Sequence, residues 1–199
     1  MTQDWTGNRT SLFTPLGASN HTNQERETND YYATDPQALE ILMQHKQLPQ
    51  VIYECACGAG HLSKVLEQNG HQVLSTDLIN RGYGVSGVDF LAVKTIPEDC
   101  TCILTNPPYK YTADFIAHAL ELLPEEGEAI FLLNVNALAG QNRFRRFYSH
   151  GILSDVYLFT KRIKCAKNGL FAATQSSAVN YAWFVFRKGY KGSTFLHWI

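Results

Sequence analysis

The chain of 199 residues alternates short apolar runs with stretches in which apolar residues recur every three or four positions. The short runs predict buried strands and the periodic stretches predict helices. Their regular alternation predicts an α/β fold, with a mostly parallel sheet covered by helices on both faces. The expected strands span residues 51–57, 72–76, 101–105, 129–135, 154–161 and 178–186, the last of them antiparallel.

Capping signals locate the helices between these strands. Thr34 or Asp35 can cap a first helix, and Pro36 suits its first turn because its fixed backbone angle matches the helix. The other elements are three helices, a glycine-rich loop and a helical turn near Phe90. The helices are expected over residues 62–69, 111–123 and 141–149, and the loop over residues 82–89.

The composition is that of an ordinary soluble globule, with 45% hydrophobic and 18% charged residues. The length suits one domain, residues 30–199, preceded by a polar arm, residues 1–29, that shows no sustained period. No apolar run approaches the roughly 20 residues that cross a bilayer, and the polar start of the chain has no signal-peptide core. We therefore expect a cytoplasmic protein.

Five cysteines are an odd number, and they are not spaced like a disulfide framework, which fits a reducing compartment. Cys55-x-Cys57 and Cys100-x-Cys102 could be imagined as a four-thiolate zinc site. Both pairs lie in strand-like runs, however, and lack the two-residue gap with a turn. Buried, inert thiols are the favoured interpretation because free cysteine packs as a small hydrophobe, and no metal is expected.

The net charge of −1 hides an uneven distribution along the chain. Residues 1–142 contain 7 Lys and Arg against 17 Asp and Glu, whereas residues 143–191 contain 10 Lys and Arg against Asp155 alone. Such a split favours a surface that faces a polyanion such as nucleic acid. The alternative is a solvated basic face that acids from the first half compensate.

The tetrapeptide Asn106-Pro107-Pro108-Tyr109 follows the apolar run of residues 102–104. Proline cannot donate to a sheet ladder, so the two prolines end the expected strand abruptly. An amide, an acceptor-only carbonyl and an aromatic ring are thereby placed at the carboxyl end of a strand, where open α/β sheets bind ligands. An ordinary turn that begins with Asn-Pro is the alternative.

A second motif follows the first expected strand, where Glu54 precedes Gly58-x-Gly60. Glycines between a strand and a helix let the backbone turn tightly and approach a ligand closely. The third glycine of a dinucleotide fingerprint is missing, which counts against a pyrophosphate ligand. Asp77 closes the next strand, seventeen residues after Gly60, where an acid can bind both ribose hydroxyls of an adenosine.

In this order, the motifs Glu54…Gly58-x-Gly60, Asp77, Val88-Asp89-Phe90 and Asn106-Pro-Pro-Tyr109 resemble those of S-adenosylmethionine-dependent amino-methyltransferases. More narrowly, the chain is similar to DNA adenine-N6 methyltransferases, especially the small ones of phages and mobile elements. Those enzymes also carry segments like residues 29–36 and 181–189. The resemblance covers residues 29–199 and implies the Rossmann-like, seven-stranded methyltransferase fold with an antiparallel C-terminal strand.

The resemblance also implies roles for individual residues around S-adenosylmethionine. Asp77 would bind the ribose hydroxyls, Asp89 would accept from the adenine amine, and Phe90 would lie beside the adenine ring. The other expected cofactor contacts lie near the methionine and ribose portions: Tyr32, Thr34, Glu54, Ala56, Gly58, Gly60, Leu78 and Asn106. The catalytic group would be Asn106, Pro107 and Tyr109, which hold the substrate base.

The chemistry explains why such a motif is needed. The lone pair of an exocyclic aromatic amine is delocalised into the ring, so the amine is a poor nucleophile. The Asn106 side-chain oxygen and the Pro107 carbonyl can accept both amine hydrogens and shift the nitrogen towards tetrahedral geometry as it attacks. Tyr109 would stack on a base that has flipped out of a duplex. Positioning and electrostatics would carry most of the rate enhancement, because the sulfonium is already a good leaving group.

The basic second half supplies candidates for contacts with DNA. The expected phosphate contacts are Arg143, Arg145, Arg146, Lys164 and Lys167. Phe171 is either a second face of the base pocket or an ordinary core aromatic, and both interpretations stay open.

The chain departs from many sequence-specific relatives, which carry a separate target-recognition domain. Residues 30–199 leave little room for one, so we expect specificity that is short, loop-encoded or supplied by a partner protein. Three other substrates fit the same motif: an RNA base, cytosine N4 in DNA, and the glutamine side chain of a release factor. A nucleic-acid-binding module on a degenerate methyltransferase scaffold is the non-enzymatic alternative.

Overall fold

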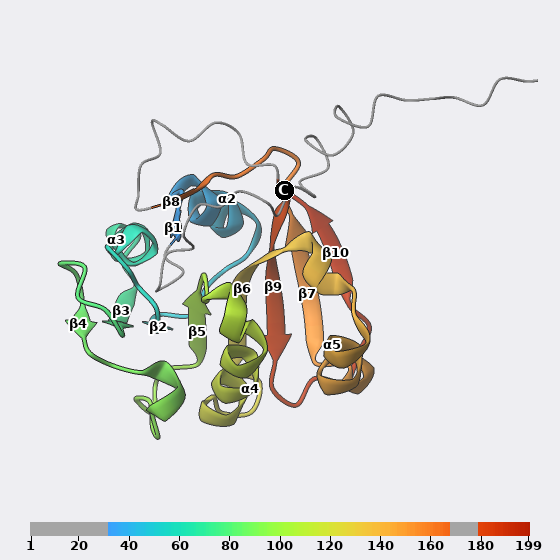
Figure 1. The fold of residues 1–199 in the computed structure, drawn as a ribbon. Helices are drawn as coiled ribbons and strands as arrows, with labels where there is room; N and C mark the ends of the chain where they lie inside the picture. Colours follow the sequence, from blue (N-terminus) through green and yellow to red (C-terminus); the bar gives the residue numbers. More distant parts are fainter. Residues whose placement is uncertain (1–31, 168–178) are drawn as a thin grey trace, which may run out of the picture.

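The computed structural model describes residues 32–167 and 179–199. Within them, eight strands form one sheet in the order β10-β7-β9-β6-β5-β2-β3-β4 (Figure 1). Every neighbouring pair is parallel except those of β9, which runs antiparallel to β6 and β7. The strands are β2 Val51–Glu54, β3 Gln72–Asp77, β4 Val85–Ser86, β5 Cys102–Thr105, β6 Glu128–Asn134, β7 Leu153–Leu158, β9 Tyr181–Arg187 and β10 Phe195–Trp198. The predicted α/β class is therefore confirmed.

Two further strands form a small separate sheet. β1 Tyr32–Thr34 pairs antiparallel with β8 Cys165–Lys167, so that Thr34 lies opposite Cys165. One residue further, the Asp35 N–H donates to the Lys164 carbonyl at 3.1 Å. The segment before the first helix is thus attached to the segment that follows β7, more than 120 residues later in the chain.

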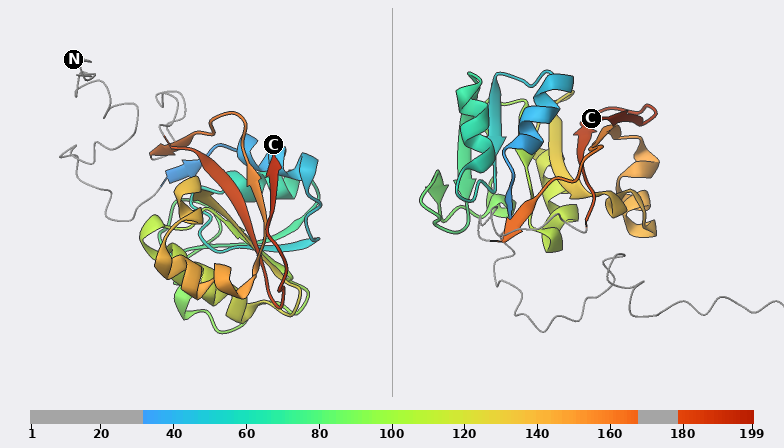
Figure 2. Two further views of the ribbon diagram at one scale, coloured as in Figure 1. Left: turned by 90° about the vertical axis from the view of Figure 1, so that its right-hand side faces the viewer. Right: turned by 90° about the horizontal axis from the view of Figure 1, so that it is seen from above.

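Helices cover both faces of the main sheet, as expected. The α-helices are α2 Gln37–His45, α3 His61–Gln68, α4 Thr112–Leu122 and α5 Gln141–Arg146, and the 3₁₀ helices are η1 Phe90–Ala92, η2 Tyr109–Tyr111, η3 Val135–Leu138 and η4 Tyr148–His150. Leu39 of α2 and Leu66 of α3 pack in one apolar cluster with Ile52. Phe115 of α4 packs in a second cluster with Phe131. Figure 2 shows α4 and α5 on the opposite side of the sheet from α2.

The antiparallel strand β9 lies at the centre of the buried half of the sheet. Trp183, Phe184 and Phe186 are each 0% exposed, so both faces of this strand are core. The Trp183 indole N–H donates to the Ala38 carbonyl at 2.9 Å and ties β9 to α2. The first residue of β9, Tyr181, lies beside Tyr109, where their two hydroxyls are 2.7 Å apart.

The structure corrects several expected element boundaries. Within the described residues, the main sheet has eight strands, two more than the six that the apolar runs predict. β4 lies inside the expected glycine-rich loop, and β10 follows β9 and pairs in parallel with β7. β10 escapes the pattern because it is an edge strand whose large apolar residues are exposed, Phe195 at 59% and Trp198 at 65%. The first main-sheet strand ends at Glu54 instead of residue 57, and α5 ends at Arg146 instead of residue 149.

Within the residues that the structure describes, no helix is both long and apolar enough to cross a membrane.

Candidate functional site

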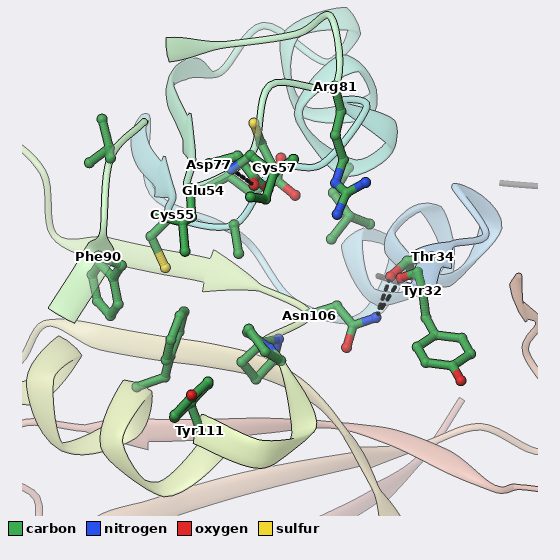
Figure 3. Close-up of a pocket in the computed structure, with 18 of the residues that line it drawn as sticks. Tyr32, Thr34, Glu54, Cys55, Cys57, Asp77, Arg81, Phe90, Asn106 and Tyr111 are labelled. Atoms are coloured by element: carbon green, nitrogen blue, oxygen red, sulfur yellow. Dashed lines mark hydrogen bonds between the residues drawn. The ribbon is translucent and has the colours of Figure 1, made fainter. Parts of the chain in front are cut away.

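A cavity of about 450 Å³ opens at the carboxyl ends of β2, β3 and β5, with β1 along one side (Figure 3). Parallel strands that end at one edge leave a crevice between their connecting loops, which is the usual ligand position in open α/β sheets. All three expected catalytic residues line it: Asn106, Pro107 and Tyr109. Nine of the eleven expected cofactor contacts line it as well: Tyr32, Thr34, Glu54, Ala56, Asp77, Leu78, Asp89, Phe90 and Asn106.

Gly58 and Gly60, the other two expected contacts, are not among the lining residues. The Gly58 N–H donates to the Asp77 carboxylate at 2.8 Å, and both glycines have positive φ angles of 58° and 76°. A Cβ on Gly60 would lie 2.4 Å from the Tyr83 ring, which leaves no space for any other residue. Both glycines therefore shape the turn, and Gly58 also holds the Asp77 carboxylate.

Asp77 is held rigidly where β3 ends. One carboxylate oxygen accepts from Gly58 N and the other accepts from Ile79 N, both at 2.8 Å. An ionised carboxylate offers about four acceptor positions, so two remain for a ligand hydroxyl. The expected role in binding vicinal hydroxyls is compatible with this geometry.

Glu54 is buried at the end of β2 and accepts a hydrogen bond from the Ser63 hydroxyl. Ser63 also pairs with the Ser75 hydroxyl at 2.7 Å, so that the three side chains form one buried polar group. Burial raises the pKa of Glu54 to about 8, against the opposing effect of the Ser63 hydrogen bond. The raised pKa favours the protonated form of this carboxyl at neutral pH.

The amide of Asn106 has a defined orientation. Its nitrogen donates to the Thr34 hydroxyl oxygen at 3.0 Å and to the Tyr32 carbonyl at 3.3 Å. Its oxygen is buried and has no hydrogen-bond partner among the described residues. Figure 3 shows this oxygen turned away from both bonds of the nitrogen. Both amide hydrogens are thus occupied, and the amide oxygen is left as an unpaired acceptor in a residue of the cavity wall.

Aromatic rings lie beside this amide. Tyr109 is 38% exposed, and its ring centroid lies 5.8 Å from that of Tyr32 with the planes tilted by 31°. Its hydroxyl forms a 2.7 Å hydrogen bond with the Tyr181 hydroxyl on β9. Tyr111 is also exposed and lines the cavity. Phe90 differs, because its ring is buried and packs 4.9 Å from that of Phe115.

The expected phosphate contacts on α5 lie outside the cavity lining and differ in availability. Arg143 donates to the carbonyls of Ala139 at 2.7 Å and Asn136 at 3.3 Å. Arg146 pairs with Asp114 at 3.0 Å, which places it beside the first turn of α4. Arg145 is exposed. We conclude that the three arginines, equivalent in the sequence, are not equivalent in the fold.

The remaining nucleic-acid candidates lie beyond β7. The Lys164 carbonyl accepts a hydrogen bond from the Asp35 N–H, and Lys167 of β8 lies opposite Tyr32 of β1. Phe171 falls outside the described residues, so both interpretations of it stay open.

Three basic residues in the cavity wall were not among the expected site residues: His61, Arg81 and Lys110. Arg81 belongs to the loop after β3, four residues beyond Asp77, and Figure 3 draws its side chain extending into the cavity. Burial and the nearby Lys64 lower the pKa of His61, which keeps its ring neutral. Arg81 belongs to no recognisable motif. Its position shortly after the carboxyl end of a strand was the available signal in the sequence.

The cysteines are placed as the favoured interpretation predicted. Cys55, Cys57, Cys100 and Cys102 are buried, and burial raises the pKa of each thiol. Cys55 and Cys100 pack in the apolar cluster under α4, whereas Cys102 packs in the cluster on the other face of the sheet. In the described part of the chain, no three His, Cys, Asp or Glu residues gather as metal ligands.

At the level of sequence, no family model matches the chain, and no curated protein does so either. Solved structures share its fold. The type IIG restriction endonuclease BpuSI superposes with a TM-score of 0.59 at 18% identity, over 84% of this chain and 26% of that one. This chain therefore spans about a quarter of the length of that enzyme.

Two further structures superpose on this chain over most of their own length. A protein of Listeria monocytogenes assigned to the class I S-adenosylmethionine-dependent methyltransferases superposes with a TM-score of 0.56 at 11% identity, over 94% of this chain and 70% of that one. Magnesium protoporphyrin IX methyltransferase of Synechocystis, with bound S-adenosylmethionine, gives 0.52 at 11% identity, over 77% and 79%. The fold of this chain is thus the Rossmann-like fold of these methyltransferases.

Proposed function

We propose that this chain transfers a methyl group from S-adenosylmethionine to the exocyclic N6 amine of adenine in DNA. The observation that carries the proposal is the Asn106 amide oxygen, which is buried in the cavity wall and has no hydrogen-bond partner among the described residues. A buried acceptor without a partner is costly in a folded protein, and such groups are typically retained where a ligand completes the hydrogen bond. A donor that enters the cavity, such as an amine hydrogen, satisfies it.

The cavity fits S-adenosylmethionine by volume and by chemistry. About 450 Å³ lies within the range of sites that hold small ligands of this size. Asp77 would hold the ribose hydroxyls through its remaining acceptor positions, and Asp89, which is exposed, would accept from the adenine amine. When bound, S-adenosylmethionine supplies an electrophilic methyl group on a sulfonium that leaves readily.

The residues of the chain position the nucleophile. The Asn106 oxygen accepts one amine hydrogen, and the Pro107 carbonyl accepts the other, so that the nitrogen lone pair is freed for attack. The rings of Tyr109 and Tyr32 offer stacking surface next to the amide, which holds a planar base in place. Both contributions act through positioning and preorganised electrostatics. An adenine in a duplex must first flip out of its stack to reach them.

Two observations support DNA as the substrate. The fold neighbour BpuSI is a restriction endonuclease, and α5 presents exposed basic residues on the same face of the sheet as α4, which begins directly after Tyr111 of the cavity wall. The same acceptor geometry would also serve an RNA base, cytosine N4 or a glutamine side chain. One assay distinguishes these substrates, because each would give a different methylated product.

The first measurement is transfer of a labelled methyl group to DNA, RNA and release-factor protein in parallel, followed by identification of the modified nucleoside or residue. N6-methyladenine in DNA is the expected product. Label in only one of the other substrates would move the proposal to that class. No transfer together with no cofactor binding in calorimetry would favour a binding module.

The decisive variant is Asn106→Ala, which removes the open acceptor. We expect transfer to fall by about a hundredfold or more, as for the loss of one preorganised hydrogen-bond group in an active site. Cofactor affinity in calorimetry should stay near that of the wild type. Asn69→Ala, at the end of α3, is the matched control and should retain full activity. A near-full rate in Asn106→Ala would contradict the mechanism.

A further inference from the structure

We infer that Arg81 binds the carboxylate of S-adenosylmethionine and thereby holds the methionine end of the cofactor. The inference deepens the proposed function, and it rests on the cofactor of that proposal and not on its DNA substrate. It gives a role to a basic residue of the cavity wall that has none in the proposed reaction.

The three basic residues of the cavity wall differ in charge and exposure. Burial and the nearby Lys64 lower the pKa of His61, which favours its neutral form. Lys110 is exposed, and its Nζ lies 5.2 Å from the centroid of the Tyr111 ring. Arg81 is half-buried, and a guanidinium keeps its charge throughout the physiological pH range. Arg81 therefore contributes a fixed positive charge to the wall itself.

The loop that carries Arg81 is anchored on both sides of this residue. Before it, the Ile79 N–H donates to the Asp77 carboxylate at 2.8 Å. After it, the Tyr83 hydroxyl donates to the Glu67 carboxylate of α3 at 2.7 Å. Two contacts thus hold the backbone of Arg81 relative to the cavity, as a binding residue requires.

Figure 3 shows the direction in which the Arg81 side chain points. The guanidinium extends towards the side of the cavity on which Thr34 and Asn106 lie, and Phe90 lies at the opposite end. In the proposed function, the adenine ring lies beside Phe90 and the methyl group reaches Asn106. A short alkyl chain joins the sulfonium to the carboxylate, so the methionine end of the cofactor falls on the side of Arg81.

The charges of the cofactor decide which of its groups Arg81 can hold. S-adenosylmethionine carries a sulfonium, an ammonium and one carboxylate. A guanidinium repels the two cations and attracts the anion, and its parallel N–H donors match the two oxygens of a carboxylate. The carboxylate is therefore the group of the cofactor that fits Arg81.

The test measures ligand affinity by titration calorimetry in wild type and Arg81→Gln. The ligands are S-adenosylmethionine and its decarboxylated analogue, which lacks only the carboxylate. We expect Arg81→Gln to weaken S-adenosylmethionine roughly tenfold to a hundredfold, as for a lost hydrogen bond between charged groups, and the analogue by less than about twofold. S-adenosylhomocysteine, which keeps the carboxylate and lacks the sulfonium charge, should weaken as much as S-adenosylmethionine.

Two further variants separate the contact from a general effect of charge. Arg81→Lys keeps the charge but loses the paired donors, so it should retain part of the affinity for S-adenosylmethionine. Lys94→Gln removes an exposed positive charge outside the cavity lining and should leave the affinity for all three ligands unchanged. If Arg81→Gln does not fold, Arg81→Lys with the same ligands provides the comparison.

An equal loss for S-adenosylmethionine and its decarboxylated analogue would overturn the inference, as would no loss for either ligand. A phosphate of the nucleic acid is the other anion that a guanidinium in this cavity would attract. Fluorescence anisotropy with a labelled DNA duplex distinguishes it, because Arg81→Gln should leave DNA affinity unchanged. Weaker DNA binding with unchanged cofactor affinity would assign Arg81 to a phosphate instead and refute the inference.

A failure of the proposed function is distinguishable from a failure of the inference. If the wild type binds S-adenosylmethionine but methylates none of the substrates, the proposed function fails, and the calorimetric comparison still decides the role of Arg81. If the wild type does not bind S-adenosylmethionine, both fail.

Discussion

At the scale of single residues, tertiary environment changes the chemistry that a residue type suggests. Glu54 is a carboxyl beside a site that resembles one for a cationic cofactor, yet burial raises its pKa to about 8. Its hydrogen bond to Ser63 is the local compensation for that burial. A raised pKa of this kind is set by the surroundings of Glu54 in the fold, and the residue type alone does not indicate it.

This raised pKa predicts how the stability of the free protein depends on pH. Between its ordinary pKa of 4.5 and its folded pKa of about 8, Glu54 keeps its proton only in the folded state. The free energy of unfolding should therefore fall as pH rises through this window, by an amount on the order of 1 kcal/mol per pH unit. Glu54→Gln, which mimics the protonated form, should flatten the dependence in urea titrations at pH 5, 6.5 and 8.

The control for this prediction is Glu125→Gln, because Glu125 is exposed in the turn before β6. It should leave the pH dependence unchanged. Parallel profiles for wild type and Glu54→Gln would show that Glu54 is ionised in the folded state.

At the scale of elements, a short helix of the candidate site is hydrogen-bonded to a strand that is buried on both faces. η2 carries Tyr109, whose hydroxyl bonds to Tyr181 at the start of β9. β9 pairs on both sides and is core on both faces, so it is a rigid support. The hydrogen bond therefore limits the rotation of the Tyr109 ring that would stack on a base.

The prediction at this scale is that Tyr181→Phe, which removes only a hydroxyl, raises KM for the nucleic-acid substrate about two- to tenfold. Tyr109→Phe should raise KM by the same factor. The double variant should raise KM no further than either single variant, because all three variants break the same hydrogen bond. Tyr157→Phe on β7 is the matched control. Additive effects of the two single changes would contradict a shared role.

At the scale of the whole molecule, the uneven charge along the chain is partly cancelled by folding. Lys46 and Arg187 both reach Glu128, at 2.8 and 2.9 Å, where β6 begins at the opposite end of the sheet from the cavity. Arg146 pairs with Asp114. Two acids of the first half, Glu128 and Asp114, thus pair with two bases of the second half, Arg187 and Arg146. Folding therefore leaves less uncompensated basic charge than the sequence indicates.

This distribution predicts different effects for two arginines. Arg145→Ala should weaken nucleic-acid binding and reduce the slope of log affinity against log salt by about one, as for the loss of one phosphate contact. Arg187→Ala should leave that slope unchanged and lower the melting temperature, because Glu128 loses a partner. Titrations at several salt concentrations, with calorimetric melting, provide both readouts. Equal slopes for Arg145→Ala and wild type would show that Arg145 does not contact the nucleic acid.

Most of the main sheet follows from the sequence, because its apolar runs and glycine or proline breaks are local signals. The strands before Asp77 and Asn106 were predicted within a few residues, and the rule that parallel strands end at one edge placed both side chains at one cavity. Strand β10 was not predictable, because an exposed edge strand lacks the alternation that burial imposes. The pairing of β1 with β8 left no local signal either.

The sequence alone thus determined which groups meet at the cavity: an acid closing β3, an amide after β5 and aromatic rings beside it. Only the tertiary structure decided their states. The Asn106 amide nitrogen donates to the backbone carbonyl of Tyr32, 74 residues away, and burial beside Ser63 and Ser75 raises the pKa of Glu54. The hydrogen bonds of the amide and the burial of the carboxyl depend on segments that are distant in the chain, so the local sequence pattern does not predict them.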